Sequence, residues 1–159
     1  MSEPRKSEAV TTFEVVFPTD TNHYGSLFGG KLISWMDKAA YYAAVKYSGF
    51  AAVTVSVERI GFAISLRTGD MLELKAQVIY AGRTSMVIKV DVYSIEMGPD
   101  KEKALATTGY FIFVALGEDG RPRRVPDMIV ETGEEKRLFE LGRTVKAEIL
   151  ARRRGGDPG

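Results

Sequence analysis

The sequence predicts an α+β fold, in which a curved antiparallel sheet of about five strands wraps around one long central helix and a second helix follows near the C-terminus. Two observations support this prediction. One nearly apolar segment has helical spacing, and five segments rich in β-forming residues are joined by connections that leave no room for a crossover helix. Parallel strands need such crossovers, so these strands must be largely antiparallel.

The central helix is expected to open at the glycine pair Gly29–Gly30 and to end at Gly49. Its charges are few, and its apolar and small residues recur at helical spacing: Leu32, Trp35, Met36, Ala39, Ala43 and Tyr47. A helix that is apolar around most of its circumference is mostly buried.

The five strands are indicated by β-forming residues and by apolar residues that alternate with polar ones. The first strand, Phe13–Phe17, is stopped by Pro18 and followed by an irregular loop. The other four are expected, between turns that carry glycine, at Val53–Glu58, Leu72–Val78, Ser85–Met97 and Lys103–Leu116.

The second helix is expected to begin at Thr132, whose hydroxyl has capping-box spacing to Glu135. An apolar stripe on this helix is expected to dock on the sheet or on a neighbouring subunit: Leu138, Leu141, Val145 and Ile149. We assign residues 1–159 to one domain, with a core over about 8–127, a helical extension at 128–153 and a disordered end at 154–159.

Composition argues against several classes of protein. The 159 residues carry 22 Lys and Arg against 21 Asp and Glu, and a net charge of +1 is not typical of a nucleic-acid or membrane-surface binder. The absence of cysteine excludes disulfides, thiolate catalysis and iron–sulfur clusters. No stretch has the character of a signal peptide or a membrane span, so we expect a cytoplasmic protein.

Two common catalytic arrangements are disfavoured. His23 is the single histidine and no Gly-x-Ser-x-Gly motif occurs, which argues against a serine-hydrolase elbow and a zinc site. The run Gly25–Lys31 matches the phosphate-loop pattern until Leu32 stands where a Ser or Thr would ligate magnesium. That motif also needs a parallel sheet. We expect neither a metal nor an organic cofactor.

The helix opening at Gly29–Gly30 is a candidate site for a carbonyl group. Unpaired N–H groups and the positive end of the helix dipole face whatever lies above the first turn. Negative charge that develops on a substrate carbonyl would be stabilised there, and one such donor is typically worth about 10²–10³ in rate. A plain glycine turn that permits close packing is the alternative.

Asp37 is the candidate general base. It lies seven residues after Gly30, which is about two helical turns, and its neighbours one turn away, Ile33, Ala40 and Tyr41, are not cations. A carboxylate on the flank of an apolar helix is costly to bury without partners, and such a group suits proton abstraction. A solvent-exposed strip is the alternative, and helix position alone does not decide between the two.

The loop before the helix supplies further polar candidates. The amide of Asn22 can orient a water or a substrate carbonyl, and it can equally form a turn in a loop rich in Thr, Asp and Gly. His23 can line a pocket or only the loop. Asp20 is a rival carboxylate whose alternative role is a turn or an N-terminal cap.

Read together, these residues resemble a family signature. The segment from Asn22 to Asp37 is similar to the N-H-x-G-x-x-F-G-G-x-x-x-x-W-M-D motif of YciA/BACH-type acyl-CoA thioesterases. Later blocks match in the family's order, and the resemblance spans most of residues 10–127: Arg59–Phe62, Gly69–Asp70, Gly82–Met86, Phe113–Leu116, Asp119–Arg123 and Val125–Pro126.

The resemblance implies a hotdog fold, which agrees with the fold predicted from periodicity. It also implies homodimers that pair their sheets edge to edge and assemble as trimers of dimers into homohexamers, with the active site at the dimer interface. The implied catalytic residues are Asp37 as general base or nucleophile, Gly30 at the oxyanion site and the partner subunit's Asn22. The implied substrate-binding residues are Gly29, His23, Phe28, Arg83, Thr84 and Ser85.

Of the substrate-binding residues, Arg83, Thr84 and Ser85 are expected near the CoA. The planar guanidinium of Arg83 suits phosphate oxygens, and a hairpin-turn arginine in water is the alternative.

The implied function is hydrolysis of acyl-CoA to CoA and a carboxylate in fatty acid metabolism. A non-catalytic acyl-CoA sensor of the same fold is the main alternative, although no DNA-binding module is attached. A hotdog dehydratase would need its histidine in a different motif, and a phosphate-loop nucleotidase would need magnesium-dependent ATP binding. Acyl chain length, dimer or hexamer, and the two roles of Asp37 are left open.

Overall fold

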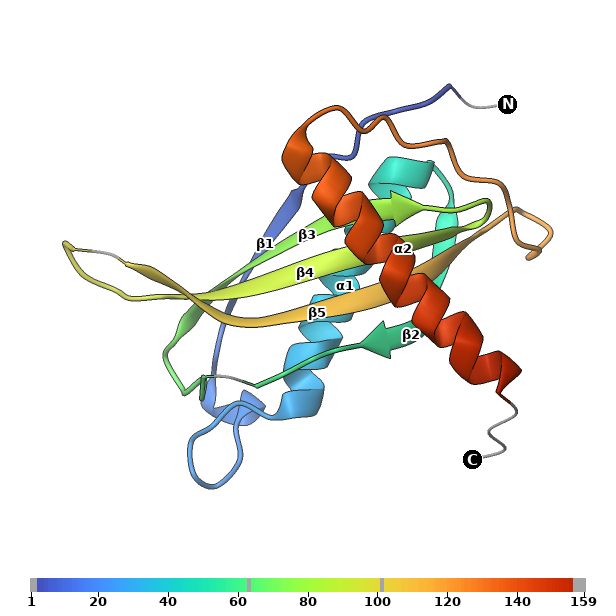
Figure 1. Cartoon of the computed structure of the whole chain (residues 1–159). Coiled ribbons are helices and arrows are strands. Elements are labelled where there is room, and N and C mark those ends of the chain that lie inside the picture. Colours follow the sequence, from blue (N-terminus) through green and yellow to red (C-terminus); the bar gives the residue numbers. More distant parts are fainter. Residues whose placement is uncertain (1–2, 63, 101, 156–159) are drawn as a thin grey trace.

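The computed structural model describes residues 3–62, 64–100 and 102–155. Its elements follow one another along the chain as β1 (Val10–Val15), the short 3-10 helix η1 (Pro18–Asp20), α1 (Gly29–Ser48), β2 (Ala51–Glu58), β3 (Met71–Ala81), β4 (Ser85–Ile95), β5 (Lys103–Leu116) and α2 (Gly133–Arg154). Figure 1 shows one curved sheet with α1 behind it and α2 crossing in front.

The five strands form a single antiparallel sheet in the order β1-β3-β4-β5-β2. This arrangement confirms the predicted fold, including the number of strands. The edges are β1 and β2, which are the strands nearest in sequence to the two ends of α1. The sheet therefore closes around the helix from both sides.

α1 is the centre of the core because most of its surface is apolar or small. Leu32 and Met36 are buried against the inner face of the sheet, and four alanines at 39, 40, 43 and 44 let the strands approach closely. The predicted end is confirmed, since Gly49 adopts a left-handed φ of 78° and its N–H donates to the carbonyl of Val45 at 2.8 Å.

α2 docks on the outer face of the same sheet, as its apolar stripe predicts. Val145 and Ile149 are buried against side chains of β3, β4 and β5, with Leu138 and Leu141 beside them. The Thr132 hydroxyl accepts the Glu135 N–H, and Glu135 accepts the Thr132 N–H, so the predicted capping box forms.

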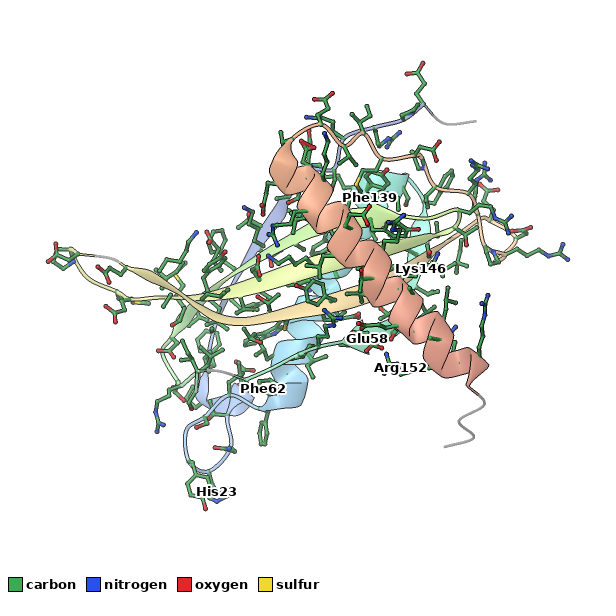
Figure 2. The ribbon with its side chains drawn as sticks, in the orientation of Figure 1. His23, Glu58, Phe62, Phe139, Lys146 and Arg152 are labelled. Carbon is green, nitrogen blue, oxygen red and sulfur yellow. The ribbon has the colours of Figure 1, made fainter. Side chains whose placement is uncertain are left out.

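Ion pairs join the far end of α2 to β2. Arg152 contacts Glu58 at 2.7 Å, and Figure 2 shows the two side chains facing each other. Burial alone would raise the pKa of Glu58, but the Ser56 hydroxyl and Arg152 outweigh it and hold this pKa below its usual range. Glu148 pairs in the same region with Arg59 at 2.6 Å.

The boundaries of some elements differ from the predicted ones. The first strand runs over Val10–Val15 rather than Phe13–Phe17, because the chain from Val16 onward bonds to the turn before β3 instead of continuing the ladder. α2 runs to Arg154, one residue past the predicted helical extension at 128–153, so Arg154 is helical although the sequence placed it in the disordered end. Residues 156–159 lie outside the described residues.

β2 is an exposed edge strand. It pairs with β5 on one side, and within the described residues no strand pairs with its other side. Val53, Val55 and Val57 are 45%, 40% and 40% exposed. An edge with unpaired N–H and C=O groups and apolar side chains is a template for pairing with another strand.

Gly142 offers a test of how closely α2 packs on the sheet. A Cβ at Gly142 would lie 2.6 Å from the Cβ of Tyr80, whereas a Cβ at Gly133 would meet nothing within 4 Å. Replacing a helical glycine with alanine normally stabilises a protein, but here overpacking should lower the free energy of unfolding by about 1–3 kcal/mol.

The matched control is Gly133→Ala, which should leave stability unchanged or slightly higher. Urea unfolding of the two variants and the unchanged protein measures the difference. Equal stability of Gly142→Ala and Gly133→Ala would show that α2 does not pack as described.

Candidate active site

The loop that precedes α1 is fixed by main-chain hydrogen bonds to the segment before β3. The N–H of Leu27 donates to the carbonyl of Leu66 at 2.7 Å, and the N–H of Thr68 donates to the carbonyl of Gly25 at 3.2 Å. The Arg67 guanidinium adds a bond to the carbonyl of Tyr24 at 2.9 Å. The polar loop is therefore held at the end of the sheet where α1 begins (Figure 1).

Asn22 organises this loop with one end of its amide. Its Oδ1 accepts the N–H groups of Tyr24 at 2.9 Å and Ser26 at 3.2 Å. The turn role considered from sequence is therefore present. Because Oδ1 is engaged with the loop, the Nδ2 group is the part of Asn22 that is available to donate to a ligand.

Gly29 and Gly30 are the first two residues of α1, as predicted. Phe28 is the N-cap, and its carbonyl accepts the N–H groups of Lys31 and Leu32. The N–H groups of the two glycines come before these first hydrogen bonds of the helix, so they have no carbonyl acceptor within it. Gly30 is exposed, and a Cβ there would meet nothing within 4 Å. The open space at Gly30 leaves room for a carbonyl oxygen beside the first turn.

Asp37 lies on the side of α1 that faces the edge strand β2, and it is half-buried. The Thr54 hydroxyl donates to Asp37 Oδ1 at 2.6 Å. The sequence left open whether the carboxylate is buried or exposed to solvent. In the structure its burial is intermediate between the two. A single strong hydrogen bond orients it.

Thr54 is a site residue that sequence reasoning missed. It lies in β2 beside a bulge, where the register with β5 shifts between Thr54 and Ser56. Thr54 pairs with Phe113, whose side chain belongs to the inner core, so the hydroxyl faces α1. Bulges often re-aim a side chain near a functional site. Nothing in the local alternation of β2 distinguishes this threonine from an ordinary strand residue.

His23 and Phe28 lie at the surface of the loop. His23 is exposed and packs against the ring of Tyr24, with 4.0 Å between the ring centroids. Figure 2 shows it at the tip of the loop, pointing away from the body of the chain. Phe28 is exposed beside the helix start.

Arg83, Thr84 and Ser85 lie at the other end of the molecule. Ser85 in β4 pairs with Val114 in β5, and Val114 pairs with Val53 in β2. Because Val53 comes soon after the end of α1, Ser85 lies at that end of the molecule. A helix of 20 residues is about 30 Å long, so this turn is far from the helix start (Figure 1). One chain therefore does not bring these residues to Gly29–Gly30.

Basic side chains surround this turn. Arg83 is exposed, and its carbonyl accepts the N–H of Val125 at 2.9 Å, which brings the exposed Arg123 and Arg124 alongside. Lys146 of α2 also reaches the turn, because a Cβ added to Gly82 would lie 2.7 Å from the Nζ of Lys146. Burial lowers the pKa of Lys146. Sequence reasoning did not find Lys146, because α2 carries several other lysines and arginines.

Asp20 and the phosphate-loop pattern have structural roles. Asp20 is buried, accepts the N–H of Phe17 at 2.9 Å and pairs with Lys31 at 3.5 Å. The pattern Gly25–Lys31 follows a short 3-10 helix and belongs to an antiparallel sheet, so it lacks the context of a phosphate loop. Across residues 3–62, 64–100 and 102–155, no three His, Cys, Asp or Glu side chains gather as metal ligands.

The fold and the helix-start geometry are those of a hotdog protein, and residues 24–99 match the Thioesterase superfamily. A Bacillus subtilis protein named uncharacterized acyl-CoA thioester hydrolase YkhA is 36% identical over 82% of this chain and 75% of its own length. The cytosolic acyl coenzyme A thioester hydrolase of Mus musculus is 30% identical over 89% of this chain, which covers 37% of that longer protein.

Solved structures give the same result. The acyl-CoA hydrolase of Staphylococcus aureus, in complex with butyryl coenzyme A, coenzyme A and coenzyme A disulfide, has a TM-score of 0.85 and 34% identity, covering 91% of this chain and 88% of its own. Alanine variants of that enzyme at a threonine, an aspartate and an asparagine are also similar. An apo-hexameric acyl-CoA thioesterase has a TM-score of 0.82 and 36% identity, covering 95% of this chain and 94% of its own.

The chain therefore belongs to the acyl-CoA thioester hydrolase family. Within the described residues, no helix has the length and hydrophobicity needed to cross a membrane.

The bond from Thr54 to Asp37 predicts a positioning role for the threonine. Thr54→Val removes the hydroxyl at nearly constant volume, so kcat for CoA release should fall roughly ten- to hundredfold, the effect of losing a hydrogen bond to a charged group. Thr54→Ser keeps the hydroxyl and should restore most of the rate. Steady-state kinetics with a thiol-trapping reagent measures both. Equal rates in the Val and Ser variants would contradict the role.

Proposed function

We propose that this protein hydrolyses acyl-CoA thioesters to CoA and a carboxylate. The observation that carries the proposal is the arrangement on α1, where the Gly29–Gly30 N–H groups begin the helix and the oriented carboxylate of Asp37 lies two turns further along. An electrophilic carbonyl and a group that activates water are the two requirements for thioester hydrolysis.

In the proposed reaction, the thioester carbonyl accepts hydrogen bonds from the N–H groups at Gly29–Gly30. Asp37 removes a proton from a water molecule, the water oxygen bonds to the carbonyl carbon, and the carbon–sulfur bond breaks. CoA leaves as a thiolate that takes up a proton. Direct attack by Asp37 would instead give an acid anhydride that water then hydrolyses.

The chemistry of Asn22 fits a substrate-binding or water-binding role. Its Oδ1 is held by the loop, so the Nδ2 group has a fixed direction. The loop lies at the end of the molecule where α1 begins (Figure 1), and its tip is exposed. We propose that Asn22 acts at the site of a second chain, because an exposed loop of this kind is placed to reach across an interface.

CoA would bind to the basic turn that carries Arg83. Thr84 and Ser85 complete this turn, and the Oγ of the buried Ser85 has no hydrogen-bond partner among the described residues. The cations at Arg83, Arg123 and Lys146 suit the phosphates of CoA.

A dimer through β2 would reunite the separated parts of the site. The exposed valines of this edge strand favour antiparallel pairing with a second copy. Such pairing places the Arg83 turn of one chain at the end where α1 of the other begins. A trimer of these dimers is the proposed larger assembly, and it is supported by the hexameric thioesterase to which this chain is similar.

The proposed reaction requires only main-chain and side-chain groups, without a metal or an organic cofactor. The variants of the Staphylococcus aureus enzyme support the choice of residues, because its threonine, aspartate and asparagine have the same spacing along the chain as Thr54, Asp37 and Asn22. The name of the mouse relative supports a cytoplasmic location.

Asp37→Asn tests the proposed base. The asparagine oxygen can still accept the Thr54 hydroxyl, but it cannot take a proton, so CoA release should fall about 10²–10⁴-fold. Glu134→Gln is the matched control, because Glu134 is an exposed carboxylate in the first turn of α2, which packs on the opposite face of the sheet from α1. Turnover that is unchanged in Asp37→Asn would contradict the assignment.

The same assay separates an enzyme from a sensor. A sensor would bind acyl-CoA in a calorimeter and release no thiol, whatever the acyl group.

Asn22→Asp tests the donor role of the amide. The carboxylate retains an oxygen for the N–H groups of Tyr24 and Ser26, so the loop should keep its shape, while the Nδ2 donor is lost. We expect kcat/KM to fall by about 10²-fold, as for other lost donors to a developing oxyanion. Stability by urea unfolding should change little. Full activity of Asn22→Asp would restrict Asn22 to its turn role.

A further inference from the structure

The segment Arg59–Phe62, which follows β2, is fixed in place by two contacts with β5. Arg59 has a left-handed φ of 54°, which turns the chain away from the strand. Ile60 then occupies the space above Gly109, where an added Cβ would lie 2.7 Å from Ile60 Cγ1 and 2.9 Å from Met36 Cε. The Thr107 hydroxyl donates to the carbonyl of Gly61.

These contacts determine where the ring of Phe62 lies. A Cβ at Gly29 would be 3.3 Å from Phe62 Cζ, so the ring covers the first residue of α1. Figure 2 shows the side chain beside the helix start. The residue is nevertheless 58% exposed. The exposed part of the ring is therefore open to a ligand bound beside Gly29.

Phe62 is common to the linings of two cavities. The first, of about 340 Å³, lies beside the helix start and is lined by Leu27, Gly29, Leu32, Phe62, Ile64, Ser65 and Leu66. The second, of about 370 Å³, lies over β5 and is lined by Gly61, Phe62, Leu105, Ala106, Thr107 and Thr108. The ring of Phe62 is the wall between them.

The first cavity suits an acyl chain. Most of its lining is aliphatic or aromatic, and Gly29 belongs to it, so it opens beside the N–H groups proposed to bind the thioester carbonyl. A ligand that places a carbonyl at Gly29 therefore directs its hydrocarbon tail along Leu32 and Leu66. A dry apolar cavity of about 150 Å³ holds one benzene, so this one has room for a chain on the order of ten carbons.

We propose that Phe62 limits the length of the acyl chain that this enzyme accepts, an inference that rests on the proposed thioesterase function. The ring closes the first cavity and denies the tail access to the space over β5. Removing the ring joins the two cavities and roughly doubles the room available to a chain. Ile60 and the hydrogen bond from Thr107 to Gly61 fix the backbone just before this wall.

Phe62→Ala tests this proposal with a series of saturated acyl-CoA substrates from acetyl to stearoyl. In the unchanged enzyme, kcat/KM should rise by up to about fourfold per methylene while the cavity fills, and then level off or fall. In Phe62→Ala the rise should continue over several more carbons. Phe62→Trp enlarges the wall and should move the optimum to shorter chains.

Phe13→Ala is the matched control, because Phe13 is 54% exposed and belongs to the linings of neither cavity. Its chain-length optimum should equal that of the unchanged enzyme. The same optimal acyl chain length in Phe62→Ala and Phe62→Trp would overturn the proposal. A loss of rate that is equal at every chain length would overturn it as well. Absence of CoA release from the unchanged protein with every substrate would instead overturn the proposed function.

Discussion

Enclosure of α1 by the sheet is the constraint on which the other features depend. The small residues at Ala39–Ala40 and Ala43–Ala44 are buried, so the strands pack against the helix at close range. α1 packs on the sheet along one face and keeps an exposed face along its length, and its polar candidates lie at the first turn and on the flank beside β2. These two places hold Gly29–Gly30 and Asp37, which are the groups proposed to carry the thioester chemistry.

The same enclosure explains why one chain carries the parts of a site without completing it. α1 separates the loop of Asn22 from the turn of Arg83 by its whole length, and the antiparallel sheet keeps them at opposite ends. An exposed edge at β2 offers the symmetric pairing that would bring opposite ends of two chains together. The unit of function proposed for this protein is therefore larger than its unit of folding.

Packing between α1 and β5 also shapes the substrate space. Gly109 leaves a gap in the inner face of β5, and Ile60 fills it against Met36. That contact orients the residues that follow, so the wall formed by Phe62 is set by the core. The same apolar layer therefore positions both Asp37, the proposed base, and Phe62, the proposed limit on chain length.

The sequence by itself determined the helices, the strands and the segment from Asn22 to Asp37, because helical period, strand alternation and glycine placement are local signals. Only the tertiary structure placed Thr54 beside Asp37 and Phe62 beside Gly29, which makes them proposed parts of the site. Thr54 looks like any strand residue until the bulge in β2 aims it at α1, and Phe62 depends on Gly109 in a distant strand. Contacts between segments that are distant in the sequence produce no periodic pattern in it, so only the folded structure shows them.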